Sequence, residues 1–233
     1  FRYGRWENER GYEGDAIFMN PYTNTSYYPR AKTEKSEGID FLEPGSWKMT
    51  SWGYPKACAN YHNPDQFFVT FGRRPTEPER TLPKFLYVSE DRGVHFKRVA
   101  NLDEPVYSMN VSRTEKQRLT VFTPKSIMNT TNFGKTWEKY NYTKDFRAAG
   151  GSRKVSGVVN PDNPDEVWVG GRDGTVIASE NGGKSWSNIS GKLPKGQVSE
   201  LVYHEGSKGD LYALVNGFGV FYKAAGKKDW QLW

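Results

Sequence analysis

The sequence predicts an all-β protein, a β-propeller built from four-stranded antiparallel blades. The pattern Ser/Thr-x-Asp/Asn-x-Gly-x-x-Trp/Phe occurs three times, at Ser89–Phe96, Thr130–Trp137 and Ser179–Trp186. Short apolar stretches separate these copies, and 24 Gly and 13 Pro supply frequent turns. Aromatic residues make up 15% of the chain, which suits short strands whose core is filled by large rings. Repeats of about 40–45 residues with many short strands are typical of propellers, with one blade per repeat.

The chemistry of the repeated pattern predicts a hairpin turn. Its Asp or Asn accepts hydrogen bonds from nearby backbone N–H groups, its Ser or Thr adds another, and its Gly allows a positive φ. The final ring begins the next strand and packs over the turn. The twelve residues to which we assign this structural role are Ser89, Asp91, Gly93, Phe96, Thr130, Asn132, Gly134, Trp137, Ser179, Asn181, Gly183 and Trp186.

Two eroded copies extend the series, at Glu34–Phe41 and Lys223–Trp230. We therefore expect one domain over residues 1–233 with about five blades, either a complete small propeller or part of a larger one. Neither end of the chain looks like a natural terminus, which favours a piece of a longer protein. The expected blades are a divergent first blade at 1–41 and pattern-bearing blades at 54–99, 105–140, 155–189 and 197–233.

Within the blades, strands are predicted where β-branched and aromatic residues run between turn residues. The first two blades have strands near 15–19, 26–29, 57–61, 66–71 and 85–88, with a charged, Pro-bearing insertion at 72–80. The third has strands near 106–111, 119–122 and 126–128. The last two have strands near 155–159, 166–171, 175–178, 198–203, 210–215 and 219–222. No segment shows sustained helical periodicity.

These features resemble the Asp-box, or BNR, repeat family, which includes sialidases, xyloglucanase-type glycoside hydrolases and sortilin-like receptors. The likeness extends beyond the eight-residue pattern to the Asn-Pro-rich turn at Asn160–Asp165, which lies between two predicted strands. It covers nearly the whole chain. The resemblance implies a propeller that works outside the cell, secreted or at the cell surface. It implies little about chemistry, because the repeats form a scaffold on which many functions are placed.

The amino-acid composition and charge of the chain limit the classes of partner and cofactor that we expect it to bind. The net charge is +6 and the pI about 9.2, which fits either an ordinary basic surface or an acidic glycan or anionic cell surface as partner. The basic residues are scattered and no nucleic-acid motif accompanies them, so nucleic acid is not expected. No apolar run approaches the ~20 residues of a transmembrane helix. With a single cysteine, Cys58, and three histidines that lack ligand spacing, we expect no metal and no cofactor.

Catalytic signatures are not recognisable in this sequence. The resemblance to sialidases would imply an arginine triad and an Arg-Ile-Pro element. The chain has arginines from which a triad could form, but it has no Arg-Ile-Pro element. Glycoside hydrolysis needs two carboxylates about 5–9.5 Å apart, and Asp162, Asp165 and Asp173 are better interpreted as turn residues. The candidate arginines are Arg30, Arg73, Arg74, Arg113, Arg147, Arg153 and Arg172.

A binding module is the favoured hypothesis, since propellers present loops around one face and ligands usually bind there. Aromatic residues in or beside the connections could form a ligand platform, although packing between blades is the commoner role. The candidates are Trp47, Trp52, Tyr54, Trp168 and Phe218. The sequence thus predicts a non-catalytic extracellular binding or assembly module for protein or glycan. The alternatives are a sialidase- or xyloglucanase-type glycoside hydrolase, and a structural subunit of a large surface or secretion complex.

Overall fold

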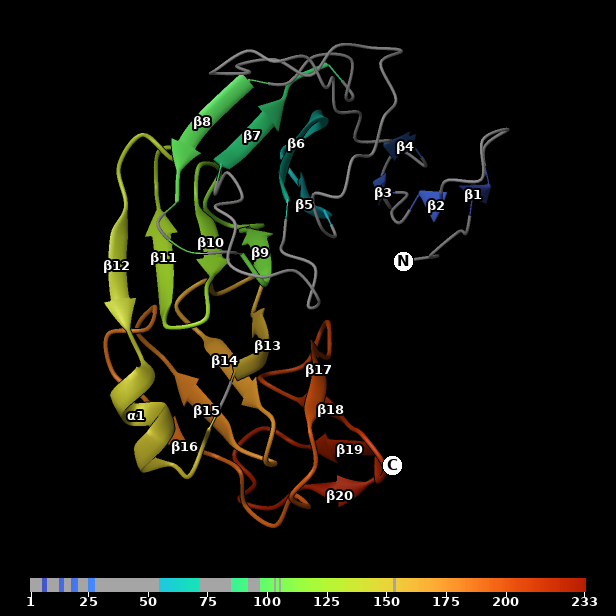
Figure 1. Ribbon diagram of the computed structural model, residues 1–233, viewed down its shortest axis with the longest axis vertical. Coiled ribbons are helices and arrows are strands. Elements are labelled where there is room, and N and C mark those ends of the chain that lie inside the picture. Colours follow the sequence, from blue (N-terminus) through green and yellow to red (C-terminus); the bar gives the residue numbers. More distant parts are fainter. Residues whose placement is uncertain are drawn as a thin grey trace. The chain divides into compact units, whose positions relative to one another are not determined.

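The computed structural model describes residues 6–7, 13–14, 18–20, 25–27, 55–71, 85–91, 97–102, 104, 106–152 and 154–233. The chain divides into two compact units, residues 1–106 with 133–135, and residues 107–132 with 136–233. Most of the described strands belong to four sheets of four antiparallel strands each (Figure 1). These sheets confirm the predicted all-β propeller fold.

In the described part of the first unit there are one four-stranded sheet and two strand pairs. The sheet runs in the order β5 (Pro55–Asn60), β6 (Asn63–Phe71), β7 (Phe85–Ser89) and β8 (Lys97–Asn101). Of the region predicted as a divergent first blade, the structure describes β1 (Trp6–Glu7) paired with β2 (Glu13–Gly14), and β3 (Phe18–Asn20) paired with β4 (Thr25–Tyr27).

The second unit holds three four-stranded sheets in which each strand pairs with its neighbour in the chain. The first sheet comprises β9 (Ser108–Val111), β10 (Leu119–Phe122), β11 (Ser126–Thr130) and β12 (Glu138–Asn141). The second comprises β13 (Lys154–Val159), β14 (Val167–Gly171), β15 (Val176–Ser179) and β16 (Ser187–Asn188). The third comprises β17 (Val198–Tyr203), β18 (Leu211–Val215), β19 (Gly219–Lys223) and β20 (Gln231–Leu232).

Two apolar clusters join these three sheets into a stack. One cluster joins Phe122 and Ile127 of the first sheet to Val167 and Val169 of the second. The other joins Trp168 of the second sheet to the third. Alternate residues of β14 thus face opposite neighbours, as the two-residue period of a strand requires. The middle sheet is buried on both faces, and the five residues of β14 form the unbroken apolar run that such burial needs.

A short helix that the sequence analysis did not anticipate, α1 (Thr143–Ala148), connects β12 to β13. Asp145 lies in its first turn and Arg147 in its last, which suits the helix dipole. Phe146 is its buried residue and joins the cluster between the first two sheets. Six residues are too few to show a helical period, so the helix was not predictable from the sequence. Among the described residues, no helix is long and apolar enough to cross a membrane.

Candidate binding site at one loop end of the sheets

The stacked sheets of the second unit have two loop ends with different contents. Because each sheet is an antiparallel meander, its first and third turns lie at one end, which we call the box end, since it carries the repeated pattern. Its second turn and the connection to the next sheet lie at the opposite end, which we call the far end. In the second sheet, the box end comprises 160–166 and 180–186, and the far end comprises 172–175.

The repeated pattern at Ser179–Trp186 forms a closed network of local hydrogen bonds. Asn181 Oδ1 accepts from Ser179 Oγ at 3.0 Å and from the Ser185 N–H at 2.9 Å. Ser179 Oγ accepts from the Gly183 N–H at 2.9 Å, where φ is +95°. Trp186 donates its indole N–H to the Gly183 carbonyl at 3.0 Å. All of these polar groups are engaged within the turn itself.

The other copies show related contacts. Asn132 Oδ1 accepts from Thr130 Oγ1 and from the Thr136 N–H, both at 2.9 Å. Ser89 Oγ donates to Asp91 Oδ1 at 2.9 Å, whereas Gly93 and Phe96 of that copy lie outside the described residues. The remaining members of the pattern, Gly134 and Trp137, lie in the described part of the second copy, and Gly134 has a φ of +87°.

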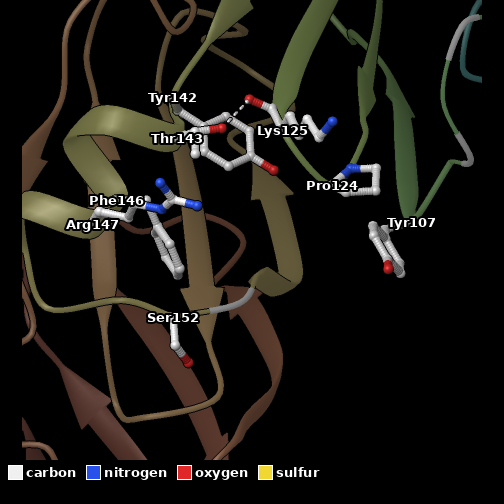
Figure 2. A pocket seen from close by; sticks show the side chains of 8 residues that line it. All are labelled: Tyr107, Pro124, Lys125, Tyr142, Thr143, Phe146, Arg147 and Ser152. Carbon is white, nitrogen blue, oxygen red and sulfur yellow. Dashed lines mark hydrogen bonds between the residues drawn. The ribbon is translucent and has the colours of Figure 1, made fainter.

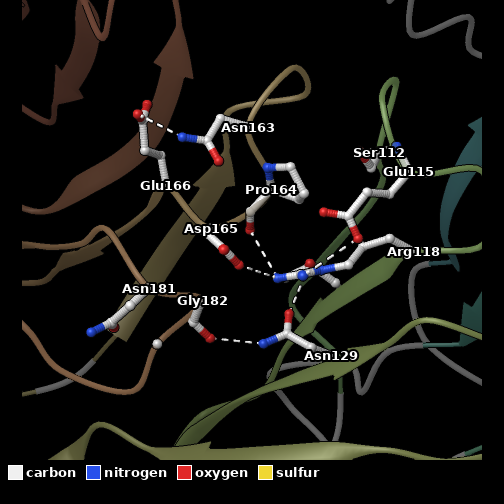
Figure 3. A network of polar contacts seen from close by, with 12 residues as sticks. Ser112, Glu115, Arg118, Asn129, Asn163, Pro164, Asp165, Glu166, Asn181 and Gly182 are labelled. Carbon is white, nitrogen blue, oxygen red and sulfur yellow. Dashed lines mark hydrogen bonds and ion pairs between the residues drawn. The ribbon is translucent and has the colours of Figure 1, made fainter.

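Ion pairs and hydrogen bonds also join neighbouring sheets at the box end (Figure 3). Arg118, from the β9–β10 turn, donates to Asp165 of the β13–β14 turn at 2.7 Å. Asn129 of β11 donates to the Gly182 carbonyl at 2.7 Å. Arg113, also from the β9–β10 turn, pairs with Glu205 of the β17–β18 turn at 2.5 Å, which links the first sheet to the third. The box end is therefore largely occupied by bonds that hold the sheets together.

A pocket of about 210 Å³ opens at the far end, beside α1 (Figure 2). Three segments form it: the start of β9, the β10–β11 turn, and the connection from β12 to β13 that contains α1. Its lining residues are Tyr107, Pro124, Lys125, Tyr142, Thr143, Phe146, Arg147 and Ser152.

Buried and exposed contacts together hold the pocket wall in place. Tyr142 is 1% exposed and donates its hydroxyl to the Thr123 carbonyl. Thr143 Oγ1 donates to the Lys125 carbonyl at 3.3 Å, which ties α1 to the β10–β11 turn (Figure 2). Phe146 packs so tightly that a Cβ on Gly151 would lie 2.4 Å from its ring. A ligand would therefore meet a largely preformed surface.

The groups that line the pocket suit an anionic or hydrogen-bonding ligand. Lys125 and Arg147 supply two cations, and Ser152 and Tyr107 supply hydroxyl groups. No carboxylate is among its lining residues. Nearby, Asp173 accepts the Ser152 N–H at 2.9 Å through Oδ2, and its buried Oδ1 has no hydrogen-bond partner. Among the described residues, no group of three or more His, Cys, Asp or Glu side chains could hold a metal ion.

Of the aromatic residues predicted as a platform, the two that the structure describes do not line this pocket. Trp168 was a candidate, but its ring is 7% exposed and stacks on Tyr203 at 5.8 Å between two sheets. Its role is therefore packing. Phe218 is 52% exposed in the β18–β19 turn, which lies at the far end. Trp47, Trp52 and Tyr54 lie outside the described residues.

The candidate arginines have separate surroundings. Arg113 contacts Glu205 at the box end, Arg147 lines the pocket, and Arg172 is exposed in the β14–β15 turn. The candidates Arg30, Arg73, Arg74 and Arg153 lie outside the described residues. The carboxylates of Asp162 and Asp165 lie in the β13–β14 turn, near Arg113 and Arg118. Sequence reasoning missed Tyr107 and Lys125, and a Pro-Lys turn beside a predicted strand was the only signal for the latter.

Comparisons with known proteins support the fold and point to two kinds of propeller protein. No family model matches the chain. It is 33% identical over 69 residues to the oligoxyloglucan-reducing end-specific xyloglucanase of Emericella nidulans, a match that covers 28% of this chain and 8% of that protein.

Solved structures are similar over more of the chain. The GH74 xyloglucanase from Xanthomonas campestris superposes with a TM-score of 0.63 at 15% identity, covering 92% of this chain and 34% of that one. The structure of YCF48 bound to D1 peptide superposes with a TM-score of 0.56 at 13% identity. The match covers 87% of this chain and 60% of that one. An ancestral GH74 enzyme superposes with a TM-score of 0.59 at 16% identity. The match covers 78% of this chain and 24% of that one. These superpositions show a shared propeller fold and nothing beyond it, and the chain spans only part of each of these proteins.

Proposed function

We propose that this protein is a non-catalytic binding module that recognises a protein or glycan ligand through the far-end pocket. One observation carries the proposal: the pocket presents two cations, aromatic surface and hydroxyl groups, and no carboxylate. Such a set can bind a ligand by charge and hydrogen bonds. It offers no general acid or base of the carboxylate type.

Hydrolysis of a glycosidic bond requires a pair of carboxylates that flank the bond, about 5–9.5 Å apart. The pocket lining supplies none, and Asp165 at the box end is engaged with Arg118. This supports binding over catalysis at the described site.

Of the two ligand classes, an acidic peptide suits the pocket better than a neutral glycan. Lys125 and Arg147 favour negative charge, and Tyr107 offers a ring beside them. Among the similar structures, YCF48 was solved with a bound peptide. We further propose that the repeated turns are Asp-box turns, that the protein acts outside the cell, and that residues 1–233 form about five blades with the boundaries predicted above.

The test is calorimetric titration with two probes, a synthetic Asp/Glu/Tyr-rich peptide and xyloglucan heptasaccharide. Arg147→Glu and Lys125→Glu should each weaken peptide binding about tenfold or more, because each change replaces attraction with repulsion. Lys208→Glu is the matched control, since Lys208 is an exposed cation of the β17–β18 turn at the box end. Equal weakening by all three variants, or the absence of binding to both probes, would contradict the proposal.

A glycoside hydrolase remains the second candidate, favoured by the 69-residue match to a xyloglucanase. Its test is release of new reducing ends from xyloglucan by the purified protein. Turnover that survives Arg147→Glu would place catalysis away from the far-end pocket and would replace the binding proposal.

A further inference from the structure

Two Asn-Gly pairs occur in the chain, Asn181-Gly182 and Asn216-Gly217, and the structure gives them opposite surroundings. An asparagine followed by glycine is prone to spontaneous deamidation, because without a Cβ the glycine backbone nitrogen can approach the asparagine side chain closely. The reaction needs a side-chain amide that can rotate and a backbone N–H that is free to lose its proton. It needs no enzyme, so it does not depend on where the protein works.

Deamidation of such a pair proceeds in two balanced steps, with water as the only co-reactant. In the first step, the glycine backbone nitrogen loses its proton and bonds to the asparagine Cγ, the Cγ–Nδ2 bond breaks, and the –NH2 group leaves with that proton as ammonia. The product is a five-membered succinimide ring. In the second step, water adds to one of the two ring carbonyl carbons and the C–N bond at that carbon breaks. Opening at Cγ gives an ordinary aspartate, and opening at the main-chain carbon gives isoaspartate, whose backbone runs through the side chain.

The pair at Asn181-Gly182 is locked at both reacting groups. Asn181 Oδ1 accepts from Ser179 Oγ at 3.0 Å and from the Ser185 N–H at 2.9 Å, and Asn181 Nδ2 donates to Ser185 Oγ at 2.8 Å. The Gly182 N–H, whose nitrogen would have to attack, donates to the Asp165 carbonyl at 2.9 Å. Gly182 is also buried. Attack on Cγ therefore requires that these bonds break first.

The pair at Asn216-Gly217 is open. Both residues are exposed in the β18–β19 turn, and nothing lies within 4 Å of a Cβ added to Gly217. Among the described residues, no polar group bonds to the Asn216 side chain or to the Gly217 N–H. The turn is held by bonds from the Asn216 N–H to the Gln197 carbonyl at 2.9 Å and from the Phe218 N–H to the Val215 carbonyl at 3.0 Å. These bonds leave both reacting groups unengaged.

We propose that Asn216 is a site of spontaneous deamidation in the folded protein, and that the repeated turn protects Asn181 from the same reaction. Hydrogen bonds of the kind around Asn181 each shift an equilibrium by about two- to tenfold. Three bonds of the Asn181 side chain and one of the Gly182 N–H must be given up before attack. Asn181 should therefore react at least about tenfold more slowly than Asn216.

Deamidation at Asn216 changes the charge and the geometry of the β18–β19 turn. A carboxylate replaces a neutral amide, so the net charge falls by one unit from its value of +6. The new charge stands at the far end of the third sheet, whereas a carboxylate formed at Asn181 would stand at the box end. Isoaspartate also adds one backbone atom between Val215 and Phe218, whose carbonyl and N–H close the turn. An aged sample should therefore contain a more acidic form in which this turn is altered.

Ageing of the purified full chain at mildly alkaline pH tests this proposal, with one sample folded and one unfolded in guanidinium chloride. Peptide mass spectrometry measures the replacement of –NH2 by –OH at positions 181 and 216, and methylation by a protein-isoaspartate methyltransferase detects isoaspartate. In the folded protein, position 216 should react at least about tenfold faster than position 181. In the unfolded protein the two positions should react at similar rates, because the bonds around Asn181 are lost.

Two variants separate the open site from the protected one. Asn216→Gln should remove the fast reaction and leave position 181 unchanged, because the longer side chain cannot close a five-membered ring. Ser185→Ala removes the acceptor of Asn181 Nδ2 at an exposed position. It should speed the reaction at position 181 by about two- to tenfold and leave position 216 unchanged.

Other results would overturn the proposal. Equal rates at the two positions in the folded protein would do so, as would a faster reaction at position 181. An intact position 216 in the folded protein, over a period in which the unfolded protein reacts, would show that this turn is protected too. An unchanged rate at position 181 in Ser185→Ala would contradict protection by the repeated turn. Ligand binding takes no part in these measurements, so this proposal and the binding proposal fail separately.

Discussion

Replacement of Gly183 by alanine tests whether the repeated turn interlocks with the neighbouring sheet. Gly183 has a φ of +95°, and a Cβ there would lie 2.2 Å from Ile127 Cγ2 of β11. The left-handed backbone costs an L-residue about 1–2 kcal/mol, and forcing a methyl group into a packed core costs about 1–3 kcal/mol. Together these two costs should lower the free energy of unfolding of the Gly183→Ala variant by about 2–5 kcal/mol.

Gly217→Ala isolates the backbone contribution. Gly217 has a φ of +81°, and nothing lies within 4 Å of a Cβ at that position. The Gly217→Ala variant should lose about 1–2 kcal/mol of its free energy of unfolding. Because 1 kcal/mol shifts the melting temperature of a protein this size by about 2–4 °C, the two variants should differ by about 2–12 °C.

The assay is urea denaturation followed by tryptophan fluorescence, with calorimetry for the melting temperature. Ile127→Ala removes the clashing methyl group, so Gly183→Ala in that background should cost only the backbone contribution. Equal losses at Gly183 and Gly217, or an unchanged cost in the Ile127→Ala background, would refute the interlocking turn.

Three further outcomes follow from the contacts. Trp230→Ala should cost about 3–5 kcal/mol in urea denaturation, since the ring is 6% exposed in the core; a loss below 1 kcal/mol would contradict its core role. A double-mutant cycle between Arg118→Met and Asp165→Asn should give a coupling of about 0.5–1 kcal/mol, because the carboxylate is half exposed; zero coupling would contradict the bridge. The pKa of Asp210 lies below its usual value because Tyr222 and a backbone N–H donate to it. The resulting stabilisation is therefore present above the unfolded-state pKa of about 3.9 and is lost as pH falls through the lower folded-state pKa of Asp210. Tyr222→Phe should lower the urea midpoint at neutral pH and converge with the wild type in acid; a constant offset between pH 2 and 8 would oppose this assignment.

Local patterns predicted the strands and turns well because each depends on a few adjacent residues. The ring of hydrogen bonds around Asn181 uses partners within four residues, so spacing alone suggests it. It was harder to predict that the side chain of Trp168 is buried between two sheets. A clue was available, since Val167–Gly171 is apolar without alternation, which indicates a strand buried on both faces.

The pocket could not be predicted, because its residues come from segments that only tertiary packing brings together. Tyr107, Lys125 and Arg147 belong to three separate connections, and none shares a motif with another. The helix that carries Arg147 is six residues long and is stabilised mainly by burial of Phe146. Helices this short gain little from intrinsic propensity, so the sequence alone could not indicate where the guanidinium would lie.

The two loop ends carry different roles for a physical reason. Turns that repeat in every blade meet their neighbours at regular intervals, so their polar groups can satisfy one another between sheets, as Asn129 and Gly182 do. A group already bonded to its neighbour is costly to redirect to a ligand, because a buried partner would lose its hydrogen bond. The far-end connections differ from blade to blade, and one of them contains a helix. Lys125 and Arg147 lie exposed in these irregular connections, beside the pocket. Under the proposed function, charge reversal of Lys125 or Arg147 should change binding more than folding, because both side chains are exposed.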